Sequence, residues 1–200
     1  MLIASTAELV RTACEEFDRE NQDVERALAE LFHHYPENRD FSHVLLKAVA
    51  LNSLYSTQIP MYTKTRSNIL DVASHIHQMG ERVDSALAAG SPEIVDAIAD
   101  VRVLGKKNRH YFSFAAKYCS WHKPESYPIF DSRVDWYVWQ LRHHPSFAEF
   151  FYTGEEHWRY SEFRRLITVL RDAYGLSSVS FKAIDKFLWK YGKKEADSEA

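Results

Sequence analysis

Long apolar runs are missing from this chain, which has no stretch approaching the roughly 18 to 20 residues that a membrane-spanning helix requires. Its start, MLIASTAELV, also lacks the basic segment and apolar core of a secretion signal. Cysteine is scarce, and Cys14 and Cys119 lie too far apart to suggest a disulfide framework or a cysteine-rich metal site. We therefore expect a cytoplasmic protein without a membrane partner.

Glycine and proline are also scarce, at six residues each, and the chain has no glycine-rich phosphate loop, internal repeat or low-complexity block. Alternating strand patterns are rare, whereas helical patterns recur from end to end. The hydrophobic content of 46% suffices for a buried core. The sequence therefore predicts an all-α protein, a compact multi-helix domain over residues 1–192, either undivided or as two lobes flanking a cleft. Residues 193–200 are expected to form a disordered tail.

Capping and breaking residues locate the expected helices. Ser5 with Glu8 forms a capping box for a first helix, which the polar residues 18–23 interrupt. A second helix starts at Asp23 and is ended by Pro36. A strongly apolar helix from about residue 42 to residue 55 is expected in the core. The other helices are expected at residues 62–79 with Gly80 as the cap, from Ser91-Pro92-Glu93, from a cap at Ser113 to Lys123-Pro124, after Asp131, and at 146–152, 161–174 and 181–191.

Charge is unevenly distributed along the chain, although the formal net charge is only −3. Residues 1–40 hold ten acids against four arginines, whereas residues 102–123 contain six lysines and arginines and no acid. The net charge argues against a protein that coats nucleic acid over its whole surface. A basic face is still compatible with it, and the cations of residues 102–109 are either phosphate contacts or an ordinary solvated surface.

The most informative stretch is FSFAAKYCSWHKPESYPIFD, residues 112–131, which pairs Lys117 with Asp131 in an aromatic setting. A partly desolvated lysine amine can attack a sugar carbon, and a carboxylate at a helix start can stabilise the positive charge that develops. Asp131 stands where an N-cap belongs, a position compatible with both capping and catalysis. Lys117 is equally compatible with an ordinary surface lysine on an amphipathic helix.

Two segments together resemble the helix-hairpin-helix DNA glycosylase superfamily, in particular its 8-oxoguanine glycosylase branch, and the resemblance spans most of the chain. AVALNSLYSTQI, residues 48–59, is similar to the family's apolar helix whose polar end enters the duplex. Residues 105–134 are similar to the family's hairpin, lysine helix, proline turn and capping aspartate. The chain departs from the family in having only Gly105 in the hairpin, and in carrying Lys117 about one helical turn beyond the family's lysine position.

The resemblance implies a DNA glycosylase, with or without AP lyase activity, that excises a damaged or modified base by flipping it out of the duplex. It implies catalysis by Asp131 and Lys117. The residues expected to contact DNA are Gly105, Lys106, Lys107, Asn108, Arg109 and Ser113 around the hairpin, and Asn52, Ser56, Thr57 and Gln58 at the end of the apolar helix. The base pocket is expected to include Trp121, Phe187 and Trp189.

Other interpretations stay open at this point. In a monofunctional enzyme, Asp131 activates water and Lys117 binds phosphate. A non-catalytic module that keeps the fold and binds nucleic acid or another protein is compatible with the missing glycine hairpin and the acidic net charge. A helical enzyme for small molecules has no supporting motif.

We expect no metal and no cofactor. The histidine pairs His33-His34 and His143-His144 are adjacent in sequence, and neighbouring side chains diverge on a helix instead of converging on one ion. The expected partner is double-stranded DNA carrying a damaged or modified base, and the expected state is a monomer.

Overall fold

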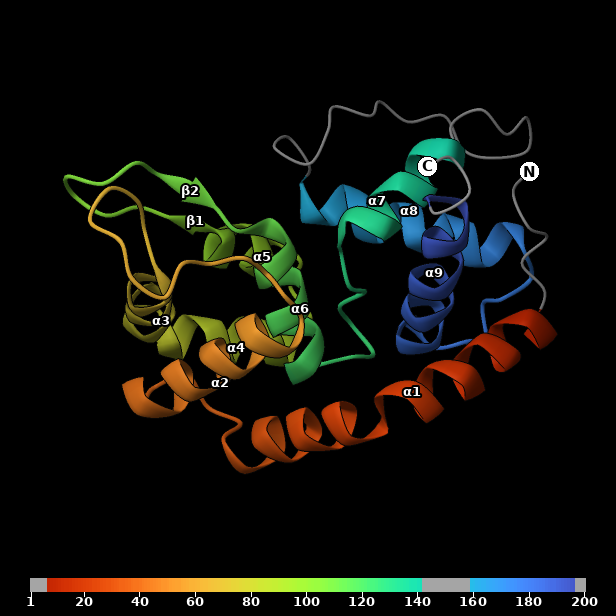
Figure 1. Cartoon of the computed structure of the whole chain (residues 1–200), viewed down its shortest axis with the longest axis horizontal. Helices are drawn as coiled ribbons and strands as arrows, with labels where there is room; N and C mark the ends of the chain where they lie inside the picture. The colour runs from red at the N-terminus through yellow and green to blue at the C-terminus, as the bar shows by residue number, and fades with distance from the viewer. Residues whose placement is uncertain (1–6, 142–158, 197–200) are drawn as a thin grey trace.

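The computed structural model describes residues 7–141 and 159–196, and within these ranges the protein is all-α apart from one short pair of strands (Figure 1). The helices are α1 (Ala7–His34), α2 (Phe41–Leu54), α3 (Ile69–Gln78), α4 (Gly80–Ala89), α5 (Glu93–Ala99), α6 (Phe112–His122), α7 (Ser132–Leu141), α8 (Tyr160–Ala173) and α9 (Phe181–Ala196). Strand β1 (Asp100–Val101) pairs antiparallel with β2 (Arg109–His110). In Figure 1, α2 to α6 and the strands form one lobe, α7 to α9 form a second, and α1 passes beneath both.

Helix α1 is continuous, so the predicted interruption at residues 18–23 is wrong. Buried apolar residues recur along one face before and after the polar segment, and Asn21 of this segment is half-buried on the same face. One of these polar residues, Asp18, forms an ion pair with Lys186 of α9. The helix packs against α9 in the second lobe and against α2 and α6 in the first, so it connects the two lobes. Ser5, its expected cap, lies outside the described residues.

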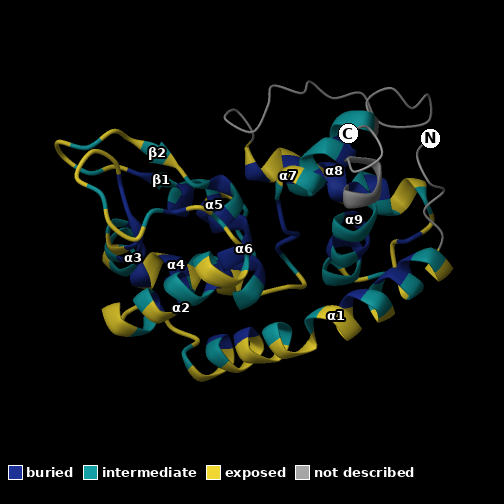
Figure 2. Ribbon diagram, in the orientation of Figure 1, coloured by how far each residue is buried: buried dark blue, intermediate teal, exposed yellow. Residues whose placement is uncertain are grey.

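The apolar helix predicted at about residues 42–55 is α2, and it is only half-buried. Asp40 caps it, since one of its carboxylate oxygens accepts the backbone N–H of His43 at 3.0 Å. One face packs against α3 in the core. The opposite face leaves Leu46 and Leu54 48% and 44% exposed, as the yellow and teal turns of α2 in Figure 2 show. The expectation of a wholly buried helix is therefore wrong.

The helix predicted at residues 62–79 begins only at Ile69. Asn68 caps α3, because its side-chain oxygen accepts the backbone N–H of Asp71 at 3.2 Å and the carboxylate of Asp71 accepts the N–H of Asn68 at 2.9 Å. This reciprocal capping box fixes the first turn of α3. Residues 61–67 are left as a loop that projects from the first lobe.

The sequence predicts helix ends at Gly80 and Gly192, but in the structure both glycines belong to helices, where they allow close packing. Gly80 begins α4, and a Cβ on Gly80 would lie 2.4 Å from the backbone oxygen of Asn38. Helix α9 continues through Gly192 to Ala196, into the predicted tail. A Cβ on Gly192 would lie 2.9 Å from the backbone oxygen of Arg133. Both positions need glycine because a neighbouring backbone comes so near.

The later helix boundaries follow the sequence more closely. Helix α5 begins at Glu93, but Pro92 is its N-cap and no side chain caps it, so the predicted cap at Ser91 is wrong. Helix α6 ends before Lys123-Pro124, and α8 begins one residue before its predicted start. The predicted cap at Ser113 is wrong, since α6 begins at Phe112 and no side chain caps it. The predicted helix at residues 146–152 and the pair His143-His144 lie outside the described residues.

Candidate functional site

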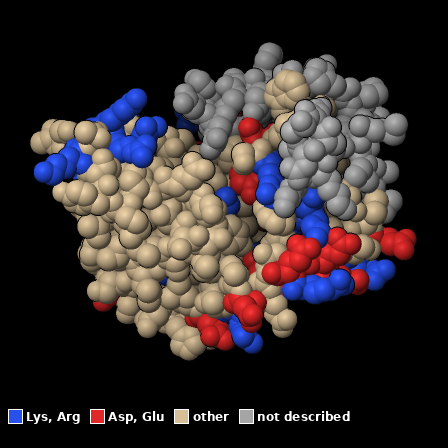
Figure 3. Space-filling view, in the orientation of Figure 1, with Lys and Arg blue, Asp and Glu red and all other residues tan. Residues whose placement is uncertain are grey.

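A cavity of about 500 Å³ lies between the two lobes. Its walls come from α1, from the turn after α2, from the first turns of α6, from residues 129–134 and from α9. Figure 3 shows acidic and basic side chains next to one another in this region between the lobes. The cavity therefore combines segments that are far apart in sequence and brings opposite charges together at its wall.

Lys117 is held inside the protein at the wall of this cavity. The residue is only 4% exposed, because α6 is buried on nearly all sides, and the interpretation of Lys117 as a surface lysine is therefore wrong. Its Nζ donates a hydrogen bond to Ser113 Oγ at 2.9 Å, one helical turn earlier. The same Nζ lies 3.9 Å from Asp131 Oδ2 and 5.8 Å from the ring centroid of Tyr55. The amine and the carboxylate thus converge on one cavity.

Asp131 caps α7, as the sequence predicts. Its Oδ1 accepts the backbone N–H groups of Arg133 and Val134, each at 3.0 Å. The N–H groups and the dipole of the helix start present positive charge to this oxygen. Oδ2 is the oxygen near Lys117. One carboxylate therefore fixes the helix with one oxygen and faces the amine with the other.

The turn after α2 forms the rim of the cavity through Ser56, Thr57 and Gln58, three residues predicted to contact DNA. Ser56 and Gln58 adopt left-handed backbone conformations, with φ of 48° and 59°. Such conformations cost roughly 1 kcal/mol or more each for residues other than glycine and are concentrated at functional sites. Asn52, also a predicted DNA contact, forms hydrogen bonds with this turn.

Asn52 holds the rim in shape through its side-chain amide. Its oxygen accepts the Thr57 hydroxyl at 2.7 Å and the backbone N–H of Ile59 at 3.0 Å, and its nitrogen donates to the Ile59 carbonyl at 2.9 Å. These bonds use the amide within the turn. Asn52 is therefore a positioning residue for the rim, and it does not line the cavity.

Asp185 of α9 is a part of the site that sequence reasoning missed. It is 5% exposed, and its Oδ2 accepts the backbone N–H of Ile129 at 2.9 Å. Its Oδ1 has no hydrogen-bond partner among the described residues. Burial raises the pKa of this carboxyl well above its usual range, and the nearby charge of Asp131 adds to the effect. Asp185 therefore supplies the cavity wall with a carboxyl that tends to stay neutral.

A second missed group is the ionic network around Glu25 of α1. One oxygen of Glu25 accepts the Tyr55 hydroxyl at 2.8 Å, and the other lies 3.1 Å from Lys182 Nζ and 3.9 Å from Lys186 Nζ. Burial is the main cause that raises the pKa of Tyr55, so the phenol stays protonated. The network connects α1, α9 and the rim turn. The sequence pattern that could have revealed this network lies in α9. Lys182, Asp185, Lys186 and Trp189 are spaced so that these charged and aromatic side chains share one face of the helix.

Of the three aromatic residues predicted for the base pocket, only Trp189 lines the cavity. The guanidinium carbon of Arg133 lies 4.3 Å from its ring centroid. Phe187 is fully buried and its ring packs against Tyr137 and Tyr191, because it lies two residues from Asp185 and so points to another side of α9. Trp121 borders a separate pocket of about 260 Å³. Phe187 and Trp121 therefore do not line this cavity.

The predicted hairpin contacts lie elsewhere. Ser113 lines the cavity, but Gly105, Lys106, Lys107, Asn108 and Arg109 do not. These five belong to the turn and second strand of the β1–β2 ribbon, at the far end of the first lobe in Figure 1. Within residues 7–141 and 159–196, no three histidine, cysteine or acidic side chains gather as a metal site. Over the same ranges, none of the helices combines the length and apolarity needed to cross a bilayer.

Comparison with known proteins gives two matches. The HI_0787_N family, described as an N-terminal domain, matches residues 9–126. An uncharacterized protein of Haemophilus influenzae is 31% identical over 143 residues, which cover 72% of this chain and 63% of that protein's length. No solved structure matches the chain. Since the family match covers more than half of the sequence, the chain belongs to the HI_0787_N family.

Proposed function

We propose that the protein is a DNA glycosylase with AP lyase activity, in which Lys117 is the nucleophile and Asp131 its carboxylate partner. The observation that carries the proposal is the position of the two groups, with Lys117 Nζ 3.9 Å from Asp131 Oδ2 at the wall of one cavity. A buried amine beside a carboxylate is an arrangement that covalent catalysis at a carbon centre requires. The resemblance to the helix-hairpin-helix glycosylases supports the assignment of Asp131, whereas Lys117 lies about one helical turn beyond the family's lysine position and is assigned from the geometry.

The cavity suits a flipped nucleotide. Its volume of about 500 Å³ falls within the range of small-molecule sites, roughly 300 to 1,000 Å³. Trp189 offers an aromatic ring to a base, and Asp185 offers a neutral carboxyl to a polar base edge. The strained turn at Ser56 and Gln58 stands at the entrance, where a side chain could fill the gap left in the duplex.

The chemistry divides into two steps. The Lys117 amine forms a bond to C1′ of the sugar, the bond from C1′ to the base breaks, and the base leaves with the electron pair and takes up the proton that the amine passes to Asp131. Asp131 stabilises the positive charge that builds on the sugar and accepts the proton released by the attacking amine. The bond from C1′ to the ring oxygen O4′ then breaks, O4′ takes up a proton, and the opened sugar carries a Schiff base to Lys117. Loss of a proton from C2′ expels the 3′ phosphate, and water hydrolyses the Schiff base to release the lysine.

Borohydride trapping tests the nucleophile. The purified protein is incubated with a duplex containing either 8-oxoguanine or an abasic site, then reduced, so that a Schiff base becomes a permanent adduct. We expect adducts in the wild type and in Lys186→Ala, a matched control that lines the same cavity but pairs with Asp18 and Glu25. Lys117→Ala should lose the adduct, and adduct formation at the wild-type level in that variant would exclude Lys117 as the nucleophile.

Product analysis separates the two rival mechanisms. Base release without strand scission, abolished in Asp131→Asn, would indicate a monofunctional enzyme that activates water. Absence of base release and of trapping from every lesion duplex, together with retained DNA affinity, would indicate a non-catalytic binding module.

A further inference from the structure

A second cluster of cations lies far from the cavity, at the upper left of Figure 3. It is carried by loop residues 61–66 and ribbon residues 102–109, which together we call the basic arm. The two segments lie side by side, since Arg66 forms a parallel β-bridge with Lys107, whose N–H donates to the Thr65 carbonyl at 3.0 Å. We propose that the basic arm binds the phosphate backbone of duplex DNA outside the cavity, a choice of partner that rests on the proposed function.

The charge of the basic arm is strongly one-sided. Its two segments contain six lysines and arginines and no acid. Two of the six are compensated from outside the arm, Arg102 by Asp100 and Lys106 by Asp71. Lys64, Arg66 and Lys107 are exposed and form no ion pair with any residue that the structure describes. Three positive charges thus face solvent on two neighbouring segments of the chain. Such an array is complementary to a linear polyanion.

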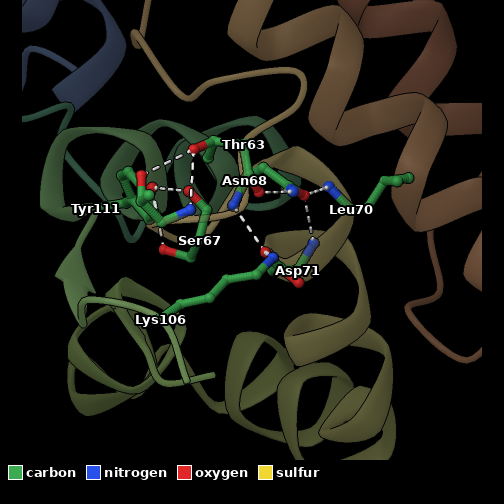
Figure 4. Close-up of polar contacts among 8 residues, drawn as sticks. Thr63, Ser67, Asn68, Leu70, Asp71, Lys106 and Tyr111 are labelled. Atoms are coloured by element: carbon green, nitrogen blue, oxygen red, sulfur yellow. Dashed lines mark hydrogen bonds and ion pairs between the residues drawn. The ribbon is translucent and has the colours of Figure 1, made fainter. Parts of the chain in front are cut away.

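The arm is fixed at its base by the polar contacts drawn in Figure 4. The Tyr111 hydroxyl donates to the Ser67 carbonyl at 2.7 Å and accepts from the Ser67 hydroxyl at 3.1 Å. Asp71 binds Lys106 and closes the capping box with Asn68. Ser67 and Asn68 are 0% and 5% exposed, so these bonds are shielded from water. The backbone that carries the free cations is therefore ordered before binding, which reduces the entropic cost of association.

The tip of the arm is apolar. Lys106 N–H donates to the Val103 carbonyl at 3.1 Å, and Gly105 has φ of +77°, as the third position of a type II turn requires. The turn leaves Leu104 fully exposed, at 103% of its reference area, and Tyr62 on the adjacent loop is 74% exposed. Apolar side chains flanked by cations fit a DNA groove, where the apolar tip contacts sugars and bases and the cations contact phosphates.

The arm and the cavity are connected by a short length of chain. The rim turn at residues 56–58 leads through the buried Ile59 to Pro60, whose carbonyl accepts the Ile69 N–H at 2.9 Å. The loop then projects toward the β1–β2 end of the first lobe (Figure 1). The proposal requires that a duplex with a nucleotide in the cavity extends toward the arm. The arm would add affinity that depends on salt and not on the lesion.

Fluorescence anisotropy with an undamaged duplex tests whether the basic arm binds DNA, independently of any catalytic step. The triple variant Lys64→Ala/Arg66→Ala/Lys107→Ala is compared with the wild type between 50 and 200 mM salt, with thermal unfolding confirming that both are folded. Loss of three phosphate contacts should reduce the slope of log K against log salt by about 2 to 3. The matched control Arg11→Ala/Arg19→Ala/Arg26→Ala removes three exposed arginines of α1 and should keep the wild-type slope.

The outcomes distinguish this proposal from the proposed activity. Equal slopes in the wild type and the arm variant would refute the arm, and so would an equal loss in the α1 control, which would reflect net charge alone. Arm-dependent binding to anionic phosphatidylglycerol vesicles without DNA affinity would assign the surface to a membrane and overturn the proposal. Failure of trapping together with an arm-dependent slope would refute the lyase and retain the arm.

Discussion

Raising the pH above 8 should increase the contribution that Lys47, a fully buried lysine of α2, makes to the free energy of unfolding. Its Nζ donates to the backbone oxygens of Tyr35 and Glu37 at 2.9 and 3.0 Å and to the Asn38 side-chain oxygen at 3.0 Å, and it lies 3.2 Å from His122 Nε2. The lysine thus joins the end of α1 to α2 and α6. All of these partners are uncharged acceptors in a buried site.

Burial lowers the pKa of Lys47 from 10.5 to about 8, and the charge of Asp84 opposes the change. Between these two pH values the unfolded chain holds a proton that the folded protein has released, so the free energy of unfolding rises with pH. Below pH 8 both states are protonated and the contribution is constant. The rise amounts to about 1.4 kcal/mol per pH unit and about 3 kcal/mol over the whole interval.

Urea unfolding of the wild type and Lys47→Met at pH 7.5, 8.5 and 9.5 measures this contribution. The comparison is needed because burial raises the pKa of Cys119 and of several tyrosines, whose titration in the unfolded chain lowers stability at the same high pH. Those contributions are common to both proteins and cancel in the difference. The free energy of unfolding of the wild type minus that of Lys47→Met should increase by about 1 to 2 kcal/mol from pH 7.5 to pH 9.5. A constant difference would refute the depressed pKa.

Two further predictions concern carboxylates of the site. Asp185→Asn should cost less than about 1 kcal/mol, because the buried acid is close in charge and shape to the amide, whereas Asp185→Ala should cost about 1 to 3 kcal/mol by leaving the Ile129 N–H without an acceptor. Urea unfolding at pH 7 measures both, and equal losses would contradict the neutral state. Asp131→Ala and Asp40→Ala each remove an N-cap and should each cost about 0.5 to 2 kcal/mol. Only the Asp131 variant should lose base release, and loss in both would indicate a stability effect.

Local interactions explain what the sequence predicted well. Asp131 caps α7 through N–H groups two and three residues ahead, so the motif that specifies the cap is contained in four consecutive residues. The local Ser91-Pro92-Glu93 pattern predicts the start of α5 to within one residue, although Pro92 and not Ser91 is the N-cap. Lys117 shares a face with Ser113 because both lie on one helix. Such features depend little on the rest of the fold.

Long-range packing explains what the sequence could not give. The polar residues 18–23 are typical of a loop, but the helix stays continuous through them because α1 packs against α9. Glu25 pairs with Lys182, which lies 157 residues away in the sequence, and no local sequence pattern predicts that contact. Asp185 is buried for the same reason. The exclusion of Phe187 follows from helix periodicity, which could have been applied to α9 once Trp189 was assigned to the cavity.

The residues that match the HI_0787_N family form only part of the cavity. The matched residues 9–126 contain Lys117, Glu25 and the rim turn, but Asp131, Asp185 and Trp189 all lie beyond them. The matched part therefore supplies the amine and one wall, while α7 and α9 supply the carboxylates and the aromatic ring. Since α1 packs against α9 as well as against α2 and α6, the first helix of the matched part also sets the position of the second lobe. Catalysis through this cavity would require both lobes, so a protein reduced to the matched residues should retain the basic arm and lose the carboxylate partner of its lysine.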